Sequence, residues 1–372
     1  MSSSRLAVGC MTGTSLDAID VAVVRIDGHG LDLRARVDRT IGGSLDDIRD
    51  DLRAACTAEE RDAEFFARLA RNLSILHIHA IEEALSARTP DLIAVHGQTI
   101  VHAPPLSTQL INAPMIAQRF DCPVVSDLRA ADLAAGGDGA PITPLADWML
   151  FRSPVHRRAV LNLGGFANLT VLPIDDGSHP VDCIAGNDVC VCNQLLNAIV
   201  QPALRVPYDA GGRIAMDGEI DENAATELAD HLRWRREAKR SLGTGDEAFA
   251  WLDMVRADLS VDDLAATAAC AIGTIIGEAI ANSRVTELLI AGGGANHGPL
   301  VRHIEAHAGL NAQPTTDHGV PVDDRESIAF AVLGALCADG IPITLPQITG
   351  CDDPPPLSGV WTNVMRARET AD

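Results

Sequence analysis

A turn of small residues near the start of the chain has the composition of a phosphate-binding hairpin. Residues 12–20 read Thr-Gly-Thr-Ser-Leu-Asp-Ala-Ile-Asp, and apolar stretches on both sides predict two strands. Glycine lets the backbone approach a ligand closely, and successive N–H groups with Thr and Ser hydroxyls can bind an anion. Because ordinary turns also need small polar residues, this segment alone leaves a nucleotide polyphosphate and a plain hairpin equally open.

A second segment of the same design lies about half a chain further on. Residues 158–172 run from an apolar stretch through Gly164-Gly165, flanked by Asn162 and Asn168, into another apolar stretch. Two strand–glycine–strand units at this separation indicate an internal duplication with one hairpin in each half.

A third segment carries three successive glycines. The apolar residues 287–291 run into Gly292-Gly293-Gly294, and a helix is predicted soon afterwards. Such a turn makes a flat backbone surface on which a base or a ribose could lie. Taken alone, this piece is better explained as a tight strand-to-helix turn.

Taken in order, these segments resemble the sugar kinase–actin–heat-shock chaperone superfamily, and more closely the 1,6-anhydro-N-acetylmuramic acid kinases. The resemblance extends to Leu345-Pro-Gln-Ile-Thr-Gly350 and rests on six ordered motifs: Gly13-Thr-Ser-Leu-Asp-Ala-Ile-Asp20, His96-Gly-Gln-Thr99, Val124-Val-Ser-Asp-Leu-Arg129 with Asp132, Gly136-Gly-Asp-Gly-Ala-Pro141, Asn162-Leu-Gly-Gly-Phe-Ala-Asn168 and Gly292-Gly-Gly-Ala-Asn296.

The resemblance implies an α/β protein with two related actin-like ATPase domains. Each domain would be a mixed sheet flanked by helices, with a central nucleotide cleft. The first would comprise residues 1–135 with 336–372, and the second residues 136–335. At 372 residues, of which 47% are hydrophobic, the chain is long enough for two cores.

The same resemblance implies ATP and Mg²⁺ as ligands. Asp17 and Asp20 would hold Mg²⁺ through water, although both could equally be solvated turn carboxylates. The implied nucleotide-binding residues are Gly13, Thr14, Ser15, Leu16, Asp17, Ala18, Ile19, Asp20, Gly164, Gly165, Asn168, Gly292, Gly293, Gly294 and Asn296. Tyr208-Asp209 with Gly211-Gly212 matches a further family segment, expected near the phosphates.

The family's reaction also needs a carboxylate. A water attacks the anomeric carbon of the anhydro sugar while the 6-oxygen leaves towards the γ-phosphate, so a base must orient and deprotonate that water. The family's base begins a segment Asp-Thr-Gly-Pro-Gly-Asn, which we match to residues 182–187, Asp-Cys-Ile-Ala-Gly-Asn. Asp182 is therefore the predicted catalytic base, although a turn Asp that caps a local N–H would look the same.

Four residues are implied as sugar ligands. His96 and Gln98 would hydrogen-bond hydroxyls, and Arg129 would bind an acid or phosphate through its planar fork. Arg129 could instead pair with Asp127 or Asp132. Glu326 matches a family glutamate, but a first-turn acid of a helix also explains it. We assign no role to His77, His79 and His102.

The chain departs from the family pattern in several places. Cys183, Ile184 and Ala185 replace Thr, Gly and Pro, and Ile cannot adopt the conformations open to glycine. Asp246 follows Thr244-Gly245 where an Arg is expected; milder changes are Asp138 for Gln and Ala18 for Gly. These changes keep two alternatives open: a kinase for another anhydro sugar such as levoglucosan, and a non-catalytic nucleotide-binding regulator.

Composition limits the partners. With 51 acidic and 29 basic residues the net charge is −22, which disfavours nucleic acid and anionic membranes as partners. The N-terminus does not read as a signal peptide, no apolar window of about 18 residues predicts a membrane span, and nine scattered cysteines indicate a reducing, cytoplasmic location. The expected partner is a small anhydro sugar, and the family resemblance implies a homodimer.

Hydrophobic patterning predicts the elements that carry these residues. Residues 262–282 are apolar almost all round and begin with acids, which predicts a buried helix. The predicted strands are 6–11, 19–26, 91–95, 123–126, 158–163, 169–174 and 286–291, and the predicted helices are 59–87, 222–238, 261–283, 298–307 and 325–338.

Overall fold

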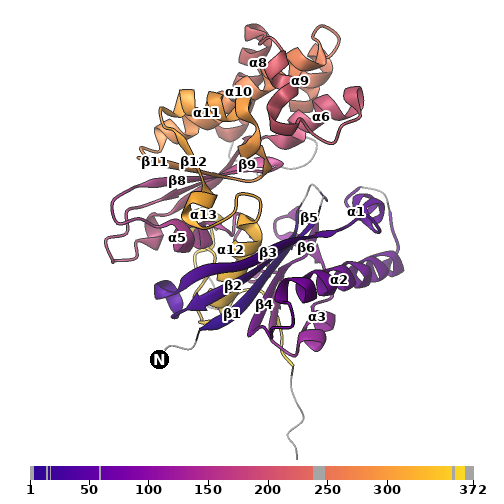
Figure 1. Ribbon diagram of the computed structural model, residues 1–372, viewed down its shortest axis with the longest axis vertical. Helices are drawn as coiled ribbons and strands as arrows, with labels where there is room; N and C mark the ends of the chain where they lie inside the picture. Colours follow the sequence, from indigo (N-terminus) through magenta and orange to yellow (C-terminus); the bar gives the residue numbers. More distant parts are fainter. Residues whose placement is uncertain are drawn as a thin grey trace, which may run out of the picture. The chain divides into compact units, whose positions relative to one another are not determined.

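The chain folds into two compact units, each built around one mixed β-sheet (Figure 1). The computed structural model describes residues 4–13, 16, 18–57, 60–237, 248–353 and 357–364. Unit 1 comprises Met1–Leu150 and Glu326–Asp372, and unit 2 comprises Phe151–Arg325. The domain limits derived above from the sequence, after residues 135 and 335, stay a prediction.

Unit 1 contains a six-stranded sheet in the order β13-β7-β4-β1-β2-β3 and a separate β5-β6 hairpin. Its strands are β1 (Arg5–Thr12), β2 (Ala18–Asp27), β3 (Arg34–Ser44), β4 (Leu92–His96), β5 (Gln98–Ala103), β6 (Leu106–Leu110), β7 (Val124–Ser126) and β13 (Val360–Thr362). Its helices are α1 (Arg49–Ala55), α2 (Ala63–Leu85), α3 (Ala113–Phe120), α4 (Ala130–Ala134), α5 (Pro144–Phe151), α12 (Arg325–Ala338) and α13 (Pro346–Thr349).

Unit 2 contains a five-stranded sheet in the order β10-β9-β8-β11-β12. Its strands are β8 (Arg158–Leu163), β9 (Phe166–Leu172), β10 (Ala185–Val191), β11 (Glu287–Ala291) and β12 (Ala312–Pro314). Its helices are α6 (Asn193–Leu204), α7 (Arg213–Asp217), α8 (Glu222–Glu237), α9 (Ala248–Val255), α10 (Val261–Asn282) and α11 (Gly298–Ala308).

The two sheets repeat one topology. In each, three antiparallel strands that follow one another in the chain lie on one side, and the first of them pairs in parallel with a later strand on its other side. β1, β2 and β4 in unit 1 thus correspond to β8, β9 and β11 in unit 2. This repeat confirms the internal duplication and the α/β class predicted from the sequence.

Strand β1 is buried on both faces. Val8 and Cys10 join a core that includes Leu69 and Leu73 of α2. The opposite face lies against α12, where a Cβ at Gly9 would fall 1.9 Å from the carbonyl oxygen of Ser327. The missing side chain at Gly9 therefore lets α12 approach the sheet closely.

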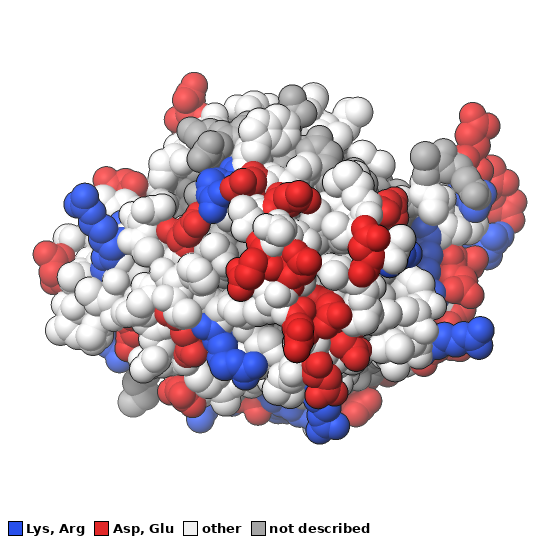
Figure 2. Space-filling model, turned by 90° about the horizontal axis from the view of Figure 1, so that it is seen from above, with Lys and Arg blue, Asp and Glu red and all other residues white. Residues whose placement is uncertain are grey.

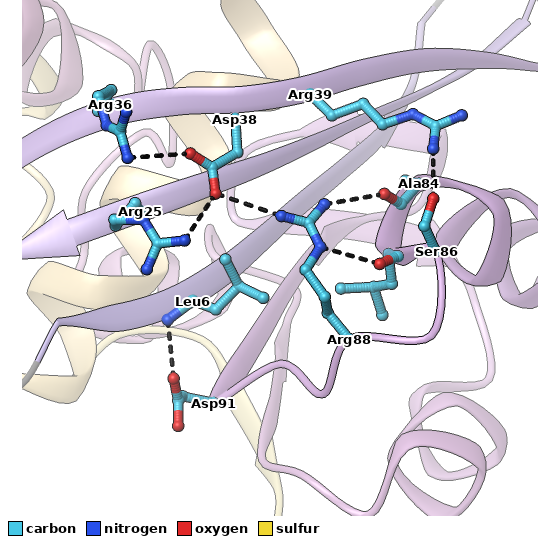
Figure 3. A network of polar contacts seen from close by, with 10 residues as sticks. Leu6, Arg25, Arg36, Asp38, Arg39, Ala84, Ser86, Arg88 and Asp91 are labelled. Atoms are coloured by element: carbon cyan, nitrogen blue, oxygen red, sulfur yellow. Dashed lines mark hydrogen bonds and ion pairs between the residues drawn. The ribbon is translucent and has the colours of Figure 1, made fainter.

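An ion cluster secures the outer part of the unit 1 sheet (Figure 3). The carboxylate of Asp38 on β3 accepts from Arg25 of β2 at 3.0 Å and from Arg88 at 3.2 Å, and it lies 3.5 Å from Arg36. Arg88 also donates to the carbonyl oxygen of Ala84 at the end of α2. The cluster joins two strands to the helix that covers them.

Helix α10 is the central helix of unit 2. It is long and apolar enough to cross a membrane by composition, but it is packed inside the unit among α6, α7, α8 and α11, and most of its residues are buried. Two glycines allow the close contact with α11: a Cβ at Gly273 or Gly277 would lie 2.4 Å from His303 or His307, respectively. The predicted buried helix is confirmed.

Candidate functional site

In unit 1 the predicted ligand-binding residues gather at one edge of the sheet. β1, β4 and β7 are parallel, so their carboxyl ends meet there. The first hairpin turn follows β1, His96 ends β4, and Arg129 follows β7. Ligands bind characteristically outside the carboxyl ends of parallel strands.

Two hydrogen bonds hold the described residues of the first hairpin turn. The Leu16 N–H donates to the Gly13 carbonyl oxygen at 3.1 Å, and Arg49 donates to the Leu16 carbonyl oxygen at 3.0 Å. Ala18, Ile19 and Asp20 begin β2, where Asp20 is half-buried opposite Met11. The predicted ligands Thr14, Ser15 and Asp17 lie outside the described residues.

A fully buried histidine contacts Thr12, the residue at which β1 ends and this turn begins. His77 of α2 has its Nδ1 3.0 Å from the Leu73 carbonyl oxygen and its Nε2 3.4 Å from Thr12 Oγ1. Burial lowers the pKa of His77 to about 4. The neutral ring therefore donates to Leu73 and accepts the hydroxyl proton of Thr12, a supporting role that the sequence did not reveal.

The predicted sugar ligands His96 and Gln98 are both buried. The His96 ring stacks on Phe330 of α12, with centroids 4.6 Å apart and planes at 8°. Glu326 lies in the first turn of α12, four residues before Phe330, so both side chains share one face of the helix. The structure thus places Glu326 and His96 on elements that contact each other.

The Arg129 side chain is hydrogen-bonded to the loop at residues 136–141. It donates to the Gly139 carbonyl oxygen at 2.7 Å, while Asp132 accepts from the Gly139 N–H and from the Thr349 hydroxyl, each at 2.8 Å. Asp132 therefore tethers the loop at residues 136–141 to α13. Burial raises the pKa of Asp127, and the nearby charge of Arg129 offsets part of that rise.

In unit 2 the second hairpin and the glycine turn pack directly together. Both follow parallel strands, Gly164-Gly165 after β8 and Gly292-Gly293-Gly294 after β11. A Cβ at Gly292 would fall 2.8 Å from the Leu163 carbonyl oxygen, and its φ of +82° also favours glycine. A Cβ at Gly293 would meet nothing within 4 Å, and Asn296 is exposed, so this surface is open.

Asn193, which we did not single out from the sequence, connects these two turns. It begins α6, and its backbone N–H donates to the Gly164 carbonyl oxygen at 3.1 Å. Its side chain donates to the Leu163 carbonyl oxygen at 2.9 Å and also lies against Gly294. Asn193 thus fixes the second hairpin turn against the glycine turn.

The predicted base Asp182 lies at the far end of this hairpin. It is exposed on a short 3-10 turn before β10, whose first residue, Ala185, pairs with Val171 near the end of β9. The Gly164-Gly165 turn adjoins the opposite end of β9. At about 3.3 Å per residue, the length of β9 separates Asp182 from the turn by roughly 20 Å.

A second carboxylate lies closer to the turn. Asp188 pairs with Asn168 across β10 and β9, and Asn168 donates to its Oδ1. The ladder is irregular between Asp188 and Cys190, where a β-bulge interrupts the register. The spacing from Asp188 to Asn193 equals that from Asp182 to Asn187, so the family pattern has a second possible match.

The loop at residues 209–212 lies against the glycine turn. Asp209 accepts from the N–H groups of Ile214 and Ala215, at 2.9 and 3.0 Å, and its Oδ2 lies 3.3 Å from His297 Nε2. His297 Nδ1 accepts the Leu300 N–H at the start of α11. Burial lowers the pKa of His297, which suits the neutral ring that this cap requires.

In the described part of the chain, no three His, Cys, Asp or Glu side chains cluster as a metal site. Mg²⁺ bound to a nucleotide needs only one or two protein carboxylates, because phosphates and waters complete its coordination. Asp20, beside the first hairpin turn, fits that requirement. Thr244, Gly245 and Asp246, which carry one departure from the family pattern, lie outside the described residues.

The fold and these loops define a class: a duplicated α/β protein with ligand-binding loops at the carboxyl ends of parallel strands in each unit. More narrowly, the chain belongs to the anhydro-N-acetylmuramic acid kinase family, whose sequence model matches residues 5–362. A relative of that name from Salinibacter ruber is 34% identical, with 96% of each chain covered. Relatives from Bordetella pertussis and Bacillus cereus are 35% and 30% identical over 93% and 92% of this chain, and over 93% and 95% of their own.

Proposed function

We propose that this protein is an ATP-dependent kinase that converts 1,6-anhydro-N-acetylmuramic acid and water to N-acetylmuramic acid 6-phosphate, for peptidoglycan recycling. The observation that carries the proposal is the family match over nearly the whole chain, with the matching loops at the strand ends of both units. The reaction belongs in the cytoplasm, and a homodimer stays a prediction.

We assign phosphate binding to the hairpin turn of each unit and adenosine binding to the open surface at Gly293 and Asn296. Backbone N–H groups in such turns bind anions locally, which the strongly negative net charge makes necessary. Mg²⁺, held through Asp20 and Asp17, would neutralise charge on the phosphates.

In the sugar site, His96, Gln98, Arg129 and Glu326 would orient the anhydro sugar. The water oxygen attacks the anomeric carbon, and the bond from that carbon to the 6-oxygen breaks. The 6-oxygen forms its new bond to the γ-phosphorus as ADP leaves, and a carboxylate takes the proton from the water.

Two carboxylates compete for the role of base. Asp182 stays the sequence-based prediction. Its position supports that role less than the position of Asp188, which adjoins the second hairpin turn and is oriented by Asn168. We therefore favour Asp188, with Asn168 as the residue that positions it.

A substrate panel tests the proposed function. ATP and Mg²⁺ are combined with 1,6-anhydro-N-acetylmuramic acid, levoglucosan, N-acetylmuramic acid and N-acetylglucosamine, and phosphorylated products are identified by mass spectrometry. We expect turnover with the first sugar and incorporation of one oxygen from ¹⁸O-labelled water at its anomeric carbon. Preferred turnover of levoglucosan would select the other anhydro-sugar kinase, and ATP binding without any turnover would select the regulator.

A further inference from the structure

The surroundings of His96 contain polar groups that the proposed function leaves unexplained. Only 6% of this residue is exposed, and its ring lies flat against Phe330. Its Nε2 is 3.4 Å from Nε2 of Gln109, a β6 residue in the hairpin that β5 and β6 form. No feature of the sequence singled out Gln109.

This contact indicates which ring nitrogen of His96 carries the proton. The Gln109 amide is oriented with its nitrogen towards the ring, and an amide nitrogen can only donate, so in this orientation Nε2 of His96 is the acceptor and holds no proton. Burial first, and then the charges of Arg129 and His102, lower the pKa of His96 well below its usual value. The ring is therefore neutral, and its one proton lies on Nδ1.

The protonated nitrogen has no partner in the described part of the chain. Nδ1 of His96 is buried without a hydrogen bond, and so is Oε1 of Gln98, two residues along. Unpaired buried polar atoms are costly and uncommon. A donor and an acceptor kept unpaired at the predicted sugar site are what a hydroxyl-rich ligand would satisfy.

We propose that Gln109 is a positioning residue, which holds His96 as the Nδ1–H tautomer so that His96 donates to an oxygen of the bound sugar. This inference rests on the proposed function for the identity of the ligand. The contacts of the ring with Gln109 and Phe330 do not depend on what the ligand is.

The tautomer is measured directly by ¹⁵N NMR of the histidine side chains, with His96 assigned from its substitution. In the unliganded wild-type protein we expect protonated Nδ1 and unprotonated Nε2 at neutral pH. Gln109→Glu offers only an acceptor, so it should move the proton to Nε2. Gln109→Leu should leave a mixture, and Gln118→Leu, an exposed change on α3, should leave the wild-type spectrum.

Kinetics separate this role from a structural one. Both Gln109 variants should raise the KM for 1,6-anhydro-N-acetylmuramic acid about tenfold, as expected for one lost hydrogen bond, while the KM for ATP stays unchanged. A wild-type His96 protonated on Nε2, or a Gln109→Glu protein with an unchanged tautomer, would overturn the inference. Absence of turnover in the wild type would overturn the proposed function, and the NMR result would still stand.

Discussion

Each unit carries a buried neutral histidine beside a candidate ligand-binding loop. His77 accepts from Thr12 below the first hairpin turn, and His297 accepts the Leu300 N–H where the loop at residues 209–212 meets the glycine turn. A ring that accepts a hydrogen bond cannot do so once that nitrogen is protonated. Both loops therefore depend on histidines that stay uncharged.

His77 should make stability depend on pH. The unfolded chain binds a proton at His77 with a pKa near 6.5 and the folded chain only near 4, so the unfolded state binds more protons between these values. The free energy of unfolding should fall on acidification from pH 6.5 to 4, by about 3 kcal/mol from this residue.

Urea denaturation of His77→Gln and wild-type protein at several pH values measures this effect. The stability advantage of the wild type over the variant should shrink across that range. His79→Gln, an exposed change on the same helix, should follow the wild-type curve. An advantage that stays constant from pH 7 to pH 4 would contradict the assignment.

The choice between the two carboxylates is also a question about single residues. If Asp188 is the base, Asp188→Asn should lower kcat by about 10²- to 10⁴-fold while ATP binding persists, because only the proton transfer is lost. Asp182→Asn, in the 3-10 turn before β10, should stay close to wild type. Steady-state kinetics with calorimetric ATP titration would reverse our preference if the two variants exchanged these results.

Some residues of the candidate site could not be identified from the sequence alone. The Asp-x4-Asn spacing occurs twice in succession, and the first copy also matches the family glycine at Gly186. Only the strand register reveals that Asp188 lies closer than Asp182 to the second hairpin turn, Gly164-Gly165. His77 and Gln109 could not be found at all, because their roles depend on contacts with residues 65 and 13 positions away.

Among the contacts between elements, the one between β1 and α12 restricts the residue type most clearly, because only glycine fits at position 9. A methyl group at Gly9 would overlap the Ser327 carbonyl oxygen and lie 2.4 Å from the Ala331 backbone nitrogen. Neither atom belongs to a flexible side chain, so the helix would have to move.

Gly9→Ala should therefore destabilise unit 1 by about 3 kcal/mol, which is the cost of overfilling a packed interior. Gly42→Ala in β3 is the matched control, because its nearest contact would be 4.0 Å away, and we expect a change within about 0.5 kcal/mol. Urea denaturation followed by circular dichroism distinguishes the two, and equal stabilities would refute the close packing.

In the glycine turn, unlike at Gly9, we expect a substitution to affect ligand binding and not stability. Because Gly293 faces open space, Gly293→Val should fold normally but place methyl groups where we assign adenosine. The KM for ATP should rise about tenfold or more, with an unchanged melting temperature. Ala281→Val, exposed at the end of α10, is the control, and an unaltered KM in folded Gly293→Val protein would remove this turn from the nucleotide site.

Strong periodicity made some elements predictable. The apolar stretches of β1, β8 and β11 and the long helices α2 and α10 lie where the sequence predicts them. Strand β3 was missed because it is a mostly half-buried edge strand that contains Gly42-Gly43, and glycine pairs are typical of turns. β10 was missed because polar Asn187 and Asp188 interrupt its apolar residues.

At the scale of the whole molecule, charge dominates behaviour in solution. Acidic side chains gather near the middle of the face in Figure 2, with few basic ones among them. The net charge of −22 opposes non-specific aggregation at neutral pH.

Solubility should be lowest near pH 4.8, where the net charge vanishes, and highest above pH 7. In the same pH range the stabilisation from neutral His77 is lost. Because the net charge is then near zero, unfolded chains would repel one another little. Light scattering across pH 4–8 measures this, and aggregation that is strongest at pH 8 would contradict it.

The path of the chain through unit 1 bears on how the protein is made. α12 covers one face of a sheet that starts at residue 5, and β13 completes its edge beside β7. While the ribosome is still adding residues up to 325, the first 150 lack that cover, whereas 151–325 form an unbroken stretch that can fold as it emerges. Synthesis of this protein should therefore reverse the usual N-terminal-first order, with the middle of the chain maturing before its beginning.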